Sequence, residues 1–526
     1  MAPRETSEED IPTPPQVKGW RIFTIAFLAC MGACMFGYNL GVIGGCITLP
    51  NFHEEFHLPP TGTEEYNFIV ANIVSCFQGG TFFGALMGYP LTERFGRIPT
   101  LRVASLIFIV GSAMQTWANG SLGLMYAGRF IAGLGIGGTS LLIPLYLSEI
   151  SPPSIRGLLV GMHEILNQIS SCGGFWVNYG TLPLSGSNQW RIPLAIQVVP
   201  GGLLFLACFI IPESPRFLIR KERFEEAGKV LGRIRNLPLE HEYLRREFLS
   251  IKNQAAMEKI EGTEANANGK GLSRIFGPGD LKRLGVGILM MVAQQCTGVN
   301  AMNYYSPSIF KSIGFGGTNV TLFATGIYAI VKSIATLLSL MFFIDRTGRR
   351  KLLFIGAGGA SLSMWYIGAY IIAAKVDPDH PQNRNAAAWI GIVMVYIYAM
   401  FFSIAWNAIP WIYCSEIFPG RIRALCVSVT TATQWLGQFV IARATPYMIS
   451  NIGGGTYMFF ASCMVVIIGW VYFFVPETKG RTLESMDELF GVDRTVAAVR
   501  AQAKVDEMNE KKETEVEKKM EAMEVV

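Results

Sequence analysis

Charged side chains are scarce in this sequence. Only 16% of its 526 residues are Asp, Glu, Lys or Arg, whereas 51% are hydrophobic. A typical soluble domain carries about 25% charged residues. The shortage excludes an ordinary soluble protein and favours one that crosses the membrane several times.

Groups of residues suited to catalysis or metal binding are also missing. The ten cysteines lie in or beside apolar runs, without zinc-finger or zinc-ribbon spacing. The five histidines are scattered, and no motif combines a nucleophile, a base and an orienting group. We therefore expect a protein that is not an enzyme and that binds no metal and no cofactor. The net charge of +5 reflects loop residues and indicates no nucleic-acid partner.

Apolar windows of about 20 residues, the length needed to cross a bilayer, occur twelve times. Their approximate bounds are 21–46, 68–91, 100–118, 122–147, 158–180, 192–211, 283–307, 320–344, 351–374, 388–413, 424–449 and 455–475. Most loop Lys and Arg residues lie in 92–99, 148–157, 212–282, 345–351 and 415–423, while the loop 47–67 has none. By the positive-inside rule, we expect a multi-pass protein of the cell membrane with both termini in the cytoplasm.

Three short motifs return in the second half of the chain in the same order. Glu93-Arg-Phe-Gly-Arg97 returns as Asp345-Arg-Thr-Gly-Arg-Arg350. Ser148-Glu-Ile-Ser-Pro-Pro-Ser-Ile-Arg-Gly157 returns as Ser415-Glu-Ile-Phe-Pro-Gly-Arg-Ile-Arg-Ala424, and Pro212-Glu-Ser-Pro-Arg216 returns as Pro476-Glu-Thr-Lys-Gly-Arg481. Such repetition predicts two six-span halves with a binding site between them. The expected regions are a cytosolic tail at 1–19, six-helix halves at 20–211 and 283–475, a cytosolic linker with helices at 212–282, and a cytosolic tail at 476–526.

A run of amides interrupts the seventh apolar window. Gln294, Gln295, Asn300 and Asn303 fall within ten residues. Polar groups are costly in hydrocarbon unless they face a cavity or a partner. Amides both donate and accept hydrogen bonds, which suits a small polyhydroxylated solute. The alternative is that they only join neighbouring helices.

These motifs resemble the sugar porter family of the major facilitator superfamily over about residues 20–490. The segments Gly174-Phe-Trp-Val-Asn-Tyr179, Asn303-Tyr-Tyr-Ser-Pro307 and Trp406-Asn-Ala-Ile-Pro-Trp411 are most similar to the fungal branch that includes quinate permeases. The resemblance implies an all-α membrane protein, in which twelve transmembrane helices form two six-helix halves and the linker forms cytosolic helices. It also implies transport of a small solute by alternating access.

The resemblance implies roles for individual residues as well. Gln294, Gln295 and Asn300 match the family's substrate-binding amides of the seventh span. Trp411 matches the tenth-span tryptophan over the substrate, and Gln434 with Trp435 an eleventh-span polar and aromatic pair. Tyr304 and Tyr305 resemble aromatic residues of the outer gate.

Charged residues of the repeated loops resemble the family's inner-gate ion pairs. Such pairs hold one arrangement of the halves and break in another. Positive-inside charge alone explains part of the set. Its members are Glu93, Arg94, Arg97, Arg129, Glu149, Arg156 and Glu213 in the first half, and Asp345, Arg346, Arg349, Arg350, Glu416, Arg423 and Glu477 in the second.

Three residues depart from the family pattern in ways that concern mechanism. Asn39 replaces the first-span acid of proton-coupled members, which favours uniport. Glu164 stands where many relatives have a substrate-contacting Gln, about 12 Å above Arg156 at 1.5 Å per residue, so it is a candidate for proton binding. Lys332 stands where many relatives have a substrate-facing Asn, and a buried lysine in a membrane indicates function.

Two interpretations of Glu164 and Lys332 remain open. In the first, Lys332 attracts the carboxylate of a sugar acid or quinate-like hydroxy acid, and Glu164 carries a proton. In the second, the two charges only neutralise each other, and a neutral hexose or pentose is carried with or without protons. A non-transporting sugar sensor is a further alternative. Arg443 in the eleventh span either snorkels or braces the outer half. The expected partners are the solute, the lipid bilayer and, in the first interpretation, protons.

Overall fold

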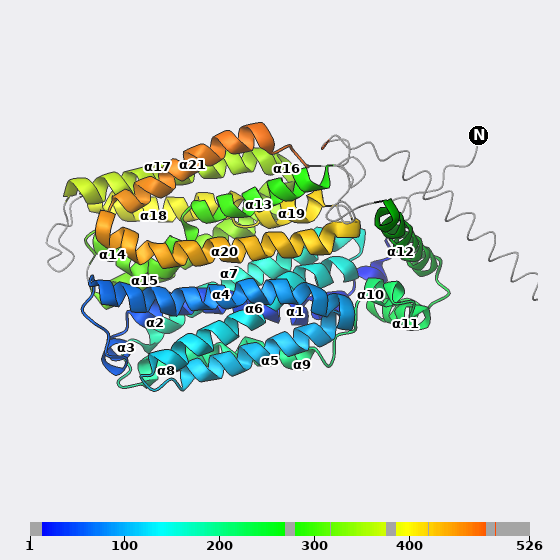
Figure 1. Cartoon of the computed structure of the whole chain (residues 1–526), viewed down its shortest axis with the longest axis horizontal. Helices are drawn as coiled ribbons and strands as arrows, with labels where there is room; N and C mark the ends of the chain where they lie inside the picture. Colours follow the sequence, from blue (N-terminus) through cyan, green and yellow to red (C-terminus); the bar gives the residue numbers. More distant parts are fainter. Residues whose placement is uncertain are drawn as a thin grey trace, which may run out of the picture.

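Long apolar helices run side by side along the long axis of the molecule (Figure 1). The computed structural model describes residues 13–268, 279–315, 317–374, 386–418, 420–479 and Phe490, and these residues form helices and no strands. Eleven helical segments in this part of the chain are long and apolar enough to span a membrane. They are Pro15–Ile47, Glu64–Phe95, Arg97–Thr116, Leu122–Ile150, Asn188–Ala207, Asp280–Ser312, Thr318–Phe343, Arg349–Ala374, Ala386–Ile417, Leu425–Ile452 and Gly455–Phe474.

The twelfth spanning helix is α7, Arg156–Thr181. It is long enough to cross a bilayer but carries polar residues such as Glu164, Asn167 and Gln168. Because of these polar residues, α7 is not among the eleven segments named above. Because α7 packs against α2 (Met31–Ile47) in the first half and against α15 (Thr318–Leu338) in the second, its polar side chains have partners inside the bundle. The twelve-helix fold predicted from the sequence is confirmed.

The bounds of the helices show that several spans are built from two pieces. The first half contains α1 Trp20–Ala29, α2 Met31–Ile47, α4 Glu64–Phe95, α5 Arg97–Thr116, α6 Leu122–Ile150, α7, α8 Asn188–Ile196 and α9 Val198–Ala207. The second contains α13 Asp280–Cys296, α14 Val299–Ser312, α15, the π-helix η5 Ser339–Phe343, α16 Ile344–Thr347, α17 Arg349–Ala374, α18 Ala386–Ala405, α19 Ile409–Ile417, α20 Gly420–Ile452 and α21 Gly455–Phe474. Helix ends inside a span leave backbone groups free for other partners.

The break between α13 and α14 requires a glycine. Gly298 has a φ of +85°, and a Cβ atom there would lie 2.8 Å from the ring of Phe460. Only glycine meets both the positive φ and the close approach without strain. This break places the amides of α13 and α14 on either side of a bend.

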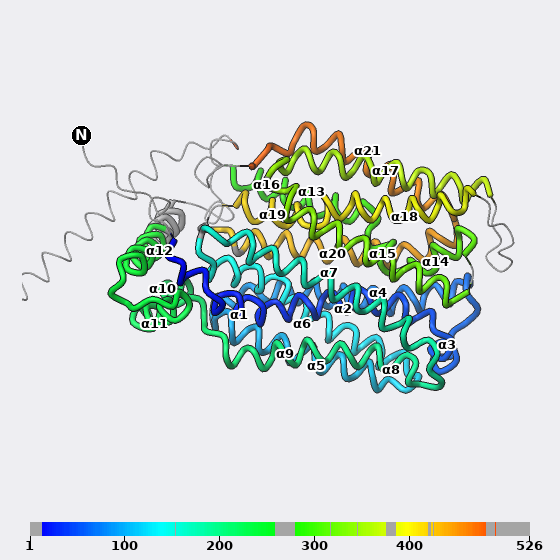
Figure 2. Tube along the Cα trace, turned by 180° about the vertical axis from the view of Figure 1, so that it is seen from behind, coloured from blue at the N-terminus to red at the C-terminus, as the bar shows by residue number. Residues whose placement is uncertain are grey.

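The two sets of helices lie side by side, with α1–α9 on one side of the bundle and α13–α21 on the other (Figures 1 and 2). They meet where α4 packs against α20, α7 against α15, and α2 against α14. Three linker helices, α10 (Pro215–Arg220), α11 (Phe224–Arg235) and α12 (Glu242–Asn268), lie beyond one end, which we call the linker end. The short helix α3 (Pro50–Glu55) marks the opposite end, the α3 end.

The linker helices are fastened to the first set of helices. Arg235, which is 1% exposed, donates to the carbonyl of Ile150 at 2.7 Å and forms an ion pair with Glu247. Arg220 pairs with Glu93 at 3.0 Å. The linker therefore has fixed contacts with the end of α6 and with the last turn of α4. Residues 1–12 of the expected N-terminal tail and most of the expected C-terminal tail lie outside the described residues.

Candidate solute-binding site

Two helix breaks meet near the middle of the bundle. Gln294, in the last turn of α13, is buried, and its Nε2 donates to the carbonyl oxygens of Trp406 at 2.6 Å and Asn407 at 3.1 Å. Both carbonyls lie between α18 and α19. Asn300 on α14 donates to Oε1 of Gln295. The structure thus brings the predicted amides of the seventh span against the interruption of the tenth.

Several buried amides, around these breaks and toward the α3 end, keep polar atoms without a hydrogen-bond partner among the described residues. Buried polar atoms normally have a partner. A solute with many hydroxyl groups can supply both donors and acceptors to such atoms. The atoms are Oε1 of Gln78, Oδ1 of Asn167, Oε1 of Gln294, Nε2 of Gln295 and Oε1 of Gln434.

Glu164 on α7 is bound by amides from both sets of helices. Its Oε1 accepts from Nδ2 of Asn407 at 2.7 Å, Nε2 of Gln168 at 2.8 Å and Nδ2 of Asn167 at 3.4 Å. Hydrogen bonds to an ionised carboxylate are the stronger kind. The three donors therefore support a negative charge at this point. Neither Asn407 nor Gln168 was predicted from the sequence as a site residue.

Lys332 on α15 is 3% exposed and has a neutral partner. Its Nζ donates to Oδ1 of Asn303 at 3.1 Å, and the same oxygen accepts from the hydroxyl of Tyr328 at 3.2 Å. The ammonium group also lies 6.0 Å from the centre of the Phe402 ring. Lys332 interacts with Glu164 by charge, but its hydrogen bond goes to the amide. Lys332 and Glu164 therefore form no direct ion pair in this conformation, and their charges act on each other at longer range.

Arg129 is placed away from the charged loops with which the sequence grouped it. It lies near the start of α6, fully buried, and its Nη1 donates to Oδ1 of Asn39 at 2.9 Å. Its Nε donates to the carbonyl of Ile73 at 3.0 Å, and its guanidinium stacks on Phe77 at 4.6 Å. The assignment of Arg129 to the inner gate is therefore corrected. The reason is that α6 begins at the α3 end, so its first turns lie far from the linker end.

The two tyrosines expected at the outer gate join the two sets of helices toward the α3 end. The hydroxyl of Tyr304 accepts from Nε2 of Gln78 on α4 at 2.9 Å and from Nε2 of Gln438 on α20 at 2.7 Å. The hydroxyl of Tyr305 donates to the carbonyl of Ala442 at 2.9 Å. Gln78 and Gln438 were missed, since no other amide lies within three residues of either one in its long helix.

Further contacts hold the same end together. A Cβ atom on Gly44 of α2 would lie 2.4 Å from the carbonyl oxygen of Tyr304, so the two backbones touch. Arg443 donates to Oδ1 of Asn72 and lies 5.0 Å from the centre of the Phe68 ring. Arg443 thus joins α20 to α4. The two sets of helices are in contact at the α3 end in this conformation.

The aromatic candidates of the tenth and eleventh spans differ in their surroundings. Trp411 on α19 is half-buried. Trp435 on α20 is 1% exposed, its Nε1 donates to Oγ of Ser140 at 3.2 Å, and its ring meets the edge of Phe36 at 5.1 Å. Trp435 therefore packs into the core of the first set of helices. Gln434 beside it is buried and keeps a free Oε1.

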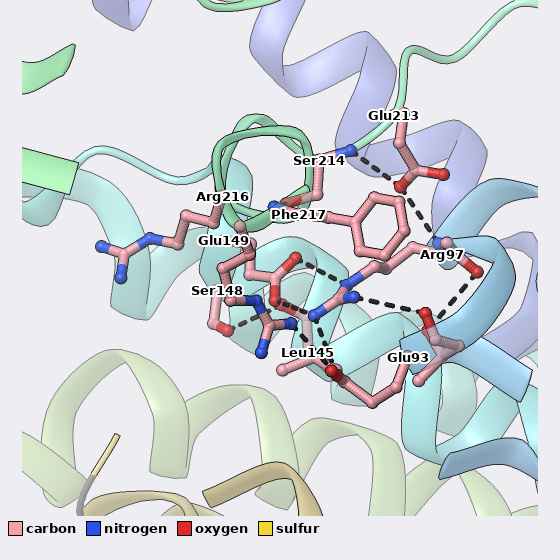
Figure 3. Close-up of polar contacts among 12 residues, drawn as sticks. Glu93, Arg97, Leu145, Ser148, Glu149, Glu213, Ser214, Arg216 and Phe217 are labelled. Atoms are coloured by element: carbon pink, nitrogen blue, oxygen red, sulfur yellow. Dashed lines mark hydrogen bonds and ion pairs between the residues drawn. The ribbon is translucent and has the colours of Figure 1, made fainter. Parts of the chain in front are cut away.

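Charged residues form a compact group at the linker end of the first set (Figure 3). Arg97 makes two hydrogen bonds to Glu149, from Nε at 3.0 Å and from Nη2 at 2.7 Å. Glu213 accepts from the backbone N–H groups of Arg97 at 3.0 Å and Ile98 at 3.1 Å, at the start of α5. An anion is stabilised at a helix N-terminus by these free N–H groups.

The second set repeats this arrangement. Arg349 pairs with Glu416 at 3.0 Å, and Glu477 accepts from the backbone N–H groups of Arg349 at 2.9 Å and Arg350 at 3.0 Å. A glycine precedes each helix, and a Cβ atom on Gly348 would lie 2.7 Å from Glu477. The repeated sequence motifs therefore encode the same local structure twice, and both of these ion pairs lie within one set of helices.

The remaining charged candidates of this group have separate surroundings. The guanidinium of Arg94 lies 5.3 Å from the Phe95 ring, and that of Arg346 lies 5.9 Å from the Phe342 ring. Arg423 donates to the carbonyl of Phe418 at 3.2 Å. Arg156 opens α7 and is partly exposed. The side chain of Asp345 lies outside the described residues.

Comparison with known proteins decides the family. The family model described as "Sugar (and other) transporter" matches residues 25–490. The chain belongs to the sugar porter family of the major facilitator superfamily. This sugar porter is 42% identical over 513 residues to a protein named probable quinate permease from Aspergillus niger, covering 94% of this chain and 92% of the relative. It is also 42% identical over 515 residues to the probable quinate permease of Aspergillus terreus, with 95% and 93% covered.

Solved structures show the same architecture. The proton:xylose symporter XylE, bound to 6-bromo-6-deoxy-D-glucose, has a TM-score of 0.74 and 25% identity, covering 90% of this sugar porter and 99% of that chain. An inward open conformation of the xylose transporter XylE from E. coli has a TM-score of 0.69 and 24% identity, covering 89% and 99%, and supports the fold alone. The predicted family is confirmed, and the protein is a multi-pass membrane transporter of the sugar type.

Proposed function

We propose that this transporter carries a sugar acid or quinate-like hydroxy acid of monosaccharide size by alternating access, and that Glu164 takes up a proton with it. One observation carries the proposal: the buried ammonium group of Lys332 is held by the neutral amide of Asn303. A buried cation is costly unless an anion compensates it. The carboxylate of a solute would provide that anion. The relatives named probable quinate permease support the same class of solute.

Charge balance connects the solute to the proton. With His163 neutral, the centre contains the cations of Lys332 and Arg129 and the carboxylate of Glu164, since Asn39 carries no charge. A solute carboxylate bound to Lys332 would compensate its positive charge in place of Glu164. Proton uptake by Glu164 then leaves the net charge of the centre unchanged. The free energy of burying charge at the centre would therefore be similar in the empty and the loaded transporter. A carrier needs this similarity because it changes conformation in both states.

The hydroxyl groups of the solute would bind the amides. Gln294, Gln295 and Gln434 each keep one buried polar atom free, and Asn300 lies beside Gln295. The half-buried ring of Trp411 offers an apolar face to the C–H face of a sugar or cyclohexane ring. In this arrangement the amides recognise the rim of the solute and Lys332 its carboxylate.

We further propose that the linker end faces the cytoplasm of the cell and that α1–α9 and α13–α21 rock as two halves. The high content of Lys and Arg in the loops of that end supports this orientation. The contacts of Tyr304, Tyr305 and Arg443 would then close the outer side and open when the solute enters. The charged groups of Arg97 and Arg349 would stabilise the inner ends of their halves.

A second function, facilitated transport of a neutral hexose or pentose, rests on Asn39. Its amide oxygen accepts from Arg129, and its Nδ2 donates to Oε1 of Gln197 at 2.9 Å, so this position cannot bind a proton. An uptake panel separates the two functions. The protein is reconstituted in liposomes, and uptake of galacturonate, quinate, glucose and xylose is measured at an acidic and a neutral external pH.

Saturable uptake of the two acids, accelerated by an inward proton gradient, is the result expected. Accumulation above the equilibrium level would show the coupling directly. Faster uptake of glucose or xylose than of either acid would overturn the acid as solute. Equal initial rates at both pH values would overturn the role of Glu164 and leave Asn39 as the better guide.

A further inference from the structure

Asn407 connects the two sets of helices at the centre of the transporter. It lies in the three-residue interruption between α18 and α19 and is 9% exposed. Its Nδ2 donates to Oε1 of Glu164 on α7 at 2.7 Å and to Oγ1 of Thr336 on α15 at 3.2 Å. Its Oδ1 accepts from Nε2 of Gln168 at 3.4 Å. The side chain therefore touches a carboxylate across the boundary between the two sets.

The bond to Glu164 depends on the charge of the carboxylate. Asn407 binds the same oxygen as two amides from the helix of Glu164 itself, those of Asn167 and Gln168. Hydrogen bonds to an ionised group are about twice as strong as those between neutral groups. A proton on Glu164 therefore weakens all three bonds, but only that of Asn407 crosses to α18 and α19.

The backbone of the interruption is tied to the solute-binding amides. Gln294 donates to the carbonyl oxygens of Trp406 and Asn407. Gln294 precedes Gln295, whose Oε1 is held by Asn300. A displacement of Asn407 would therefore move the acceptors that fix Gln294, and with them the last turn of α13.

His163 precedes Glu164 on α7 and is half-buried, so it is a second titratable group beside the carboxylate. Titratable groups on the helices packed against α7 have partners of their own. Lys332 on α15 is the charged group that interacts with Glu164 from a neighbouring helix. On α2, the thiol of Cys34 and the hydroxyl of Tyr38 donate to backbone carbonyls. Arg129 on α6 is held by acceptors from α2 and α4. Lys332 and Asn407 are thus the two groups through which the charge of Glu164 acts on the second set of helices.

We propose that Asn407 is a positioning residue that transmits the charge of Glu164 to the solute-binding amides. While Glu164 is ionised, Asn407 holds the interruption of the tenth span against α7. When Glu164 is protonated, that bond weakens, and α19 is released to move with its half. The inference rests on the proposed proton coupling through Glu164 and adds the route by which protonation changes solute affinity.

The test is the pH dependence of solute affinity in Asn407→Ala. The full-length protein is reconstituted in liposomes, and the KM and maximal rate of quinate uptake are measured at an acidic and a neutral external pH. In the parent, we expect KM to change by about fivefold, the factor for exchanging a charge-assisted bond for a neutral one. In Asn407→Ala, KM should become independent of pH, and Asn407→Gln, which restores an N–H donor, should recover part of the dependence.

Two further variants make the result specific. Thr336→Val removes the other acceptor of Asn407 and leaves Glu164 untouched, so its pH dependence should equal that of the parent. In a Glu164→Gln background, Asn407→Ala should add no further change in the pH profile. All variants are first compared by size-exclusion chromatography and by their rate of quinate exchange, so that misfolded protein is recognised.

The outcomes separate this inference from the proposed function. A parental pH dependence that persists in Asn407→Ala overturns the role of Asn407 and leaves proton coupling through Glu164 intact. A uniform rise in KM at both pH values overturns it as well, because Asn407 would then only bind the solute. A parent whose KM and rate do not respond to pH overturns both proposals.

Discussion

The ammonium group of Lys332 donates to the amide oxygen of Asn303 at 3.1 Å, so a buried cation of α15 is held by a neutral side chain of α14. Asn303 belongs to the same helix as Asn300 and Tyr304. The cation is therefore joined to the polar centre of the transporter. In the function proposed above, this cation would favour solutes that carry a carboxylate.

Replacing Lys332 should change the selectivity between acidic and neutral solutes more than the maximal rate of transport. For Lys332→Asn, we expect the KM for quinate to rise by about ten- to a hundredfold, the range for losing a hydrogen-bonded charge partner. The KM for glucose should change little, because no charge is lost from its contacts. Competition assays in liposomes measure both values. Thr325→Val on the same helix is the matched control, since Thr325 bonds only within α15. An equal loss for both solutes would indicate a structural role.

Glu164→Gln should uncouple transport from protons. The glutamine keeps an oxygen that can accept from Asn407 and Gln168, so the local structure is expected to persist. Accumulation driven by a pH gradient should disappear, while exchange of internal for external solute continues. Counterflow and net uptake in the same liposomes measure the two activities. Survival of accumulation in this variant would show that another group carries the proton.

Removing the amides of Gln295 or Asn300 should weaken solute binding. Each bond lost to a buried polar partner costs about 1–3 kcal/mol, so we expect the affinity to fall by about five- to a hundredfold. Asn178→Ala is the control, because this amide bonds to the carbonyl of Val42 in the first half and should affect stability alone. Binding is measured by the solute-induced rise in melting temperature. An unchanged affinity in folded Gln295→Ala and Asn300→Ala would place the site elsewhere.

The α3 end should become less stable at acidic pH because the carboxylate of Glu55 is protonated there. Burial raises the pKa of Glu55, but hydrogen bonds from Ser187, Trp190 and Arg191 outweigh it and hold the pKa below its usual value. A lowered pKa in the folded state gives stability that is complete above the unfolded pKa of about 4.3 and is lost as the pH falls through the folded value. Glu55→Gln should therefore melt at a lower temperature than the parent near neutral pH.

The difference between the parent and Glu55→Gln should shrink as the pH falls below about 4. Thermal unfolding of the detergent-purified proteins over a pH series gives both curves. A constant difference across the series would contradict a contribution from the ionised carboxylate.

Gly348→Ala should destabilise the linker end of the second half. Gly348 has a φ of +93° and a ψ of 156°, a region that only glycine adopts readily and that costs other residues about 1–3 kcal/mol. The added Cβ atom would also lie 2.7 Å from Glu477. Gly358→Ala is the matched control, because a Cβ atom there meets nothing within 4 Å on α17. If Gly348→Ala melted at the same temperature as Gly358→Ala, backbone strain at position 348 would be excluded as a cause of destabilisation.

Most of the fold was predictable because the bilayer imposes a simple rule on sequence. A span needs about 20 apolar residues whatever its neighbours are, and α7 was recognisable by length and position despite its polar side chains. The charged groups around Arg97 and Arg349 were predictable in the same way. Each group is formed by residues of the repeated motifs. The free N–H groups at the N-terminus of a helix stabilise an anion regardless of the surrounding fold.

The sequence by itself determined the twelve spans and the family, because the length of an apolar segment and the spacing of motifs along the chain fix these features. It also predicted the amides Gln294, Gln295 and Asn300 as a solute site, which stays a prediction. Only the tertiary structure decided which distant side chains meet. It placed Arg129 beside Asn39, joined Gln78 and Gln438 through Tyr304, and set Asn407 rather than Lys332 against Glu164. The physical reason is that such contacts depend on the rotation and lateral packing of whole helices, which are set by all their neighbours together and by no local pattern of residues.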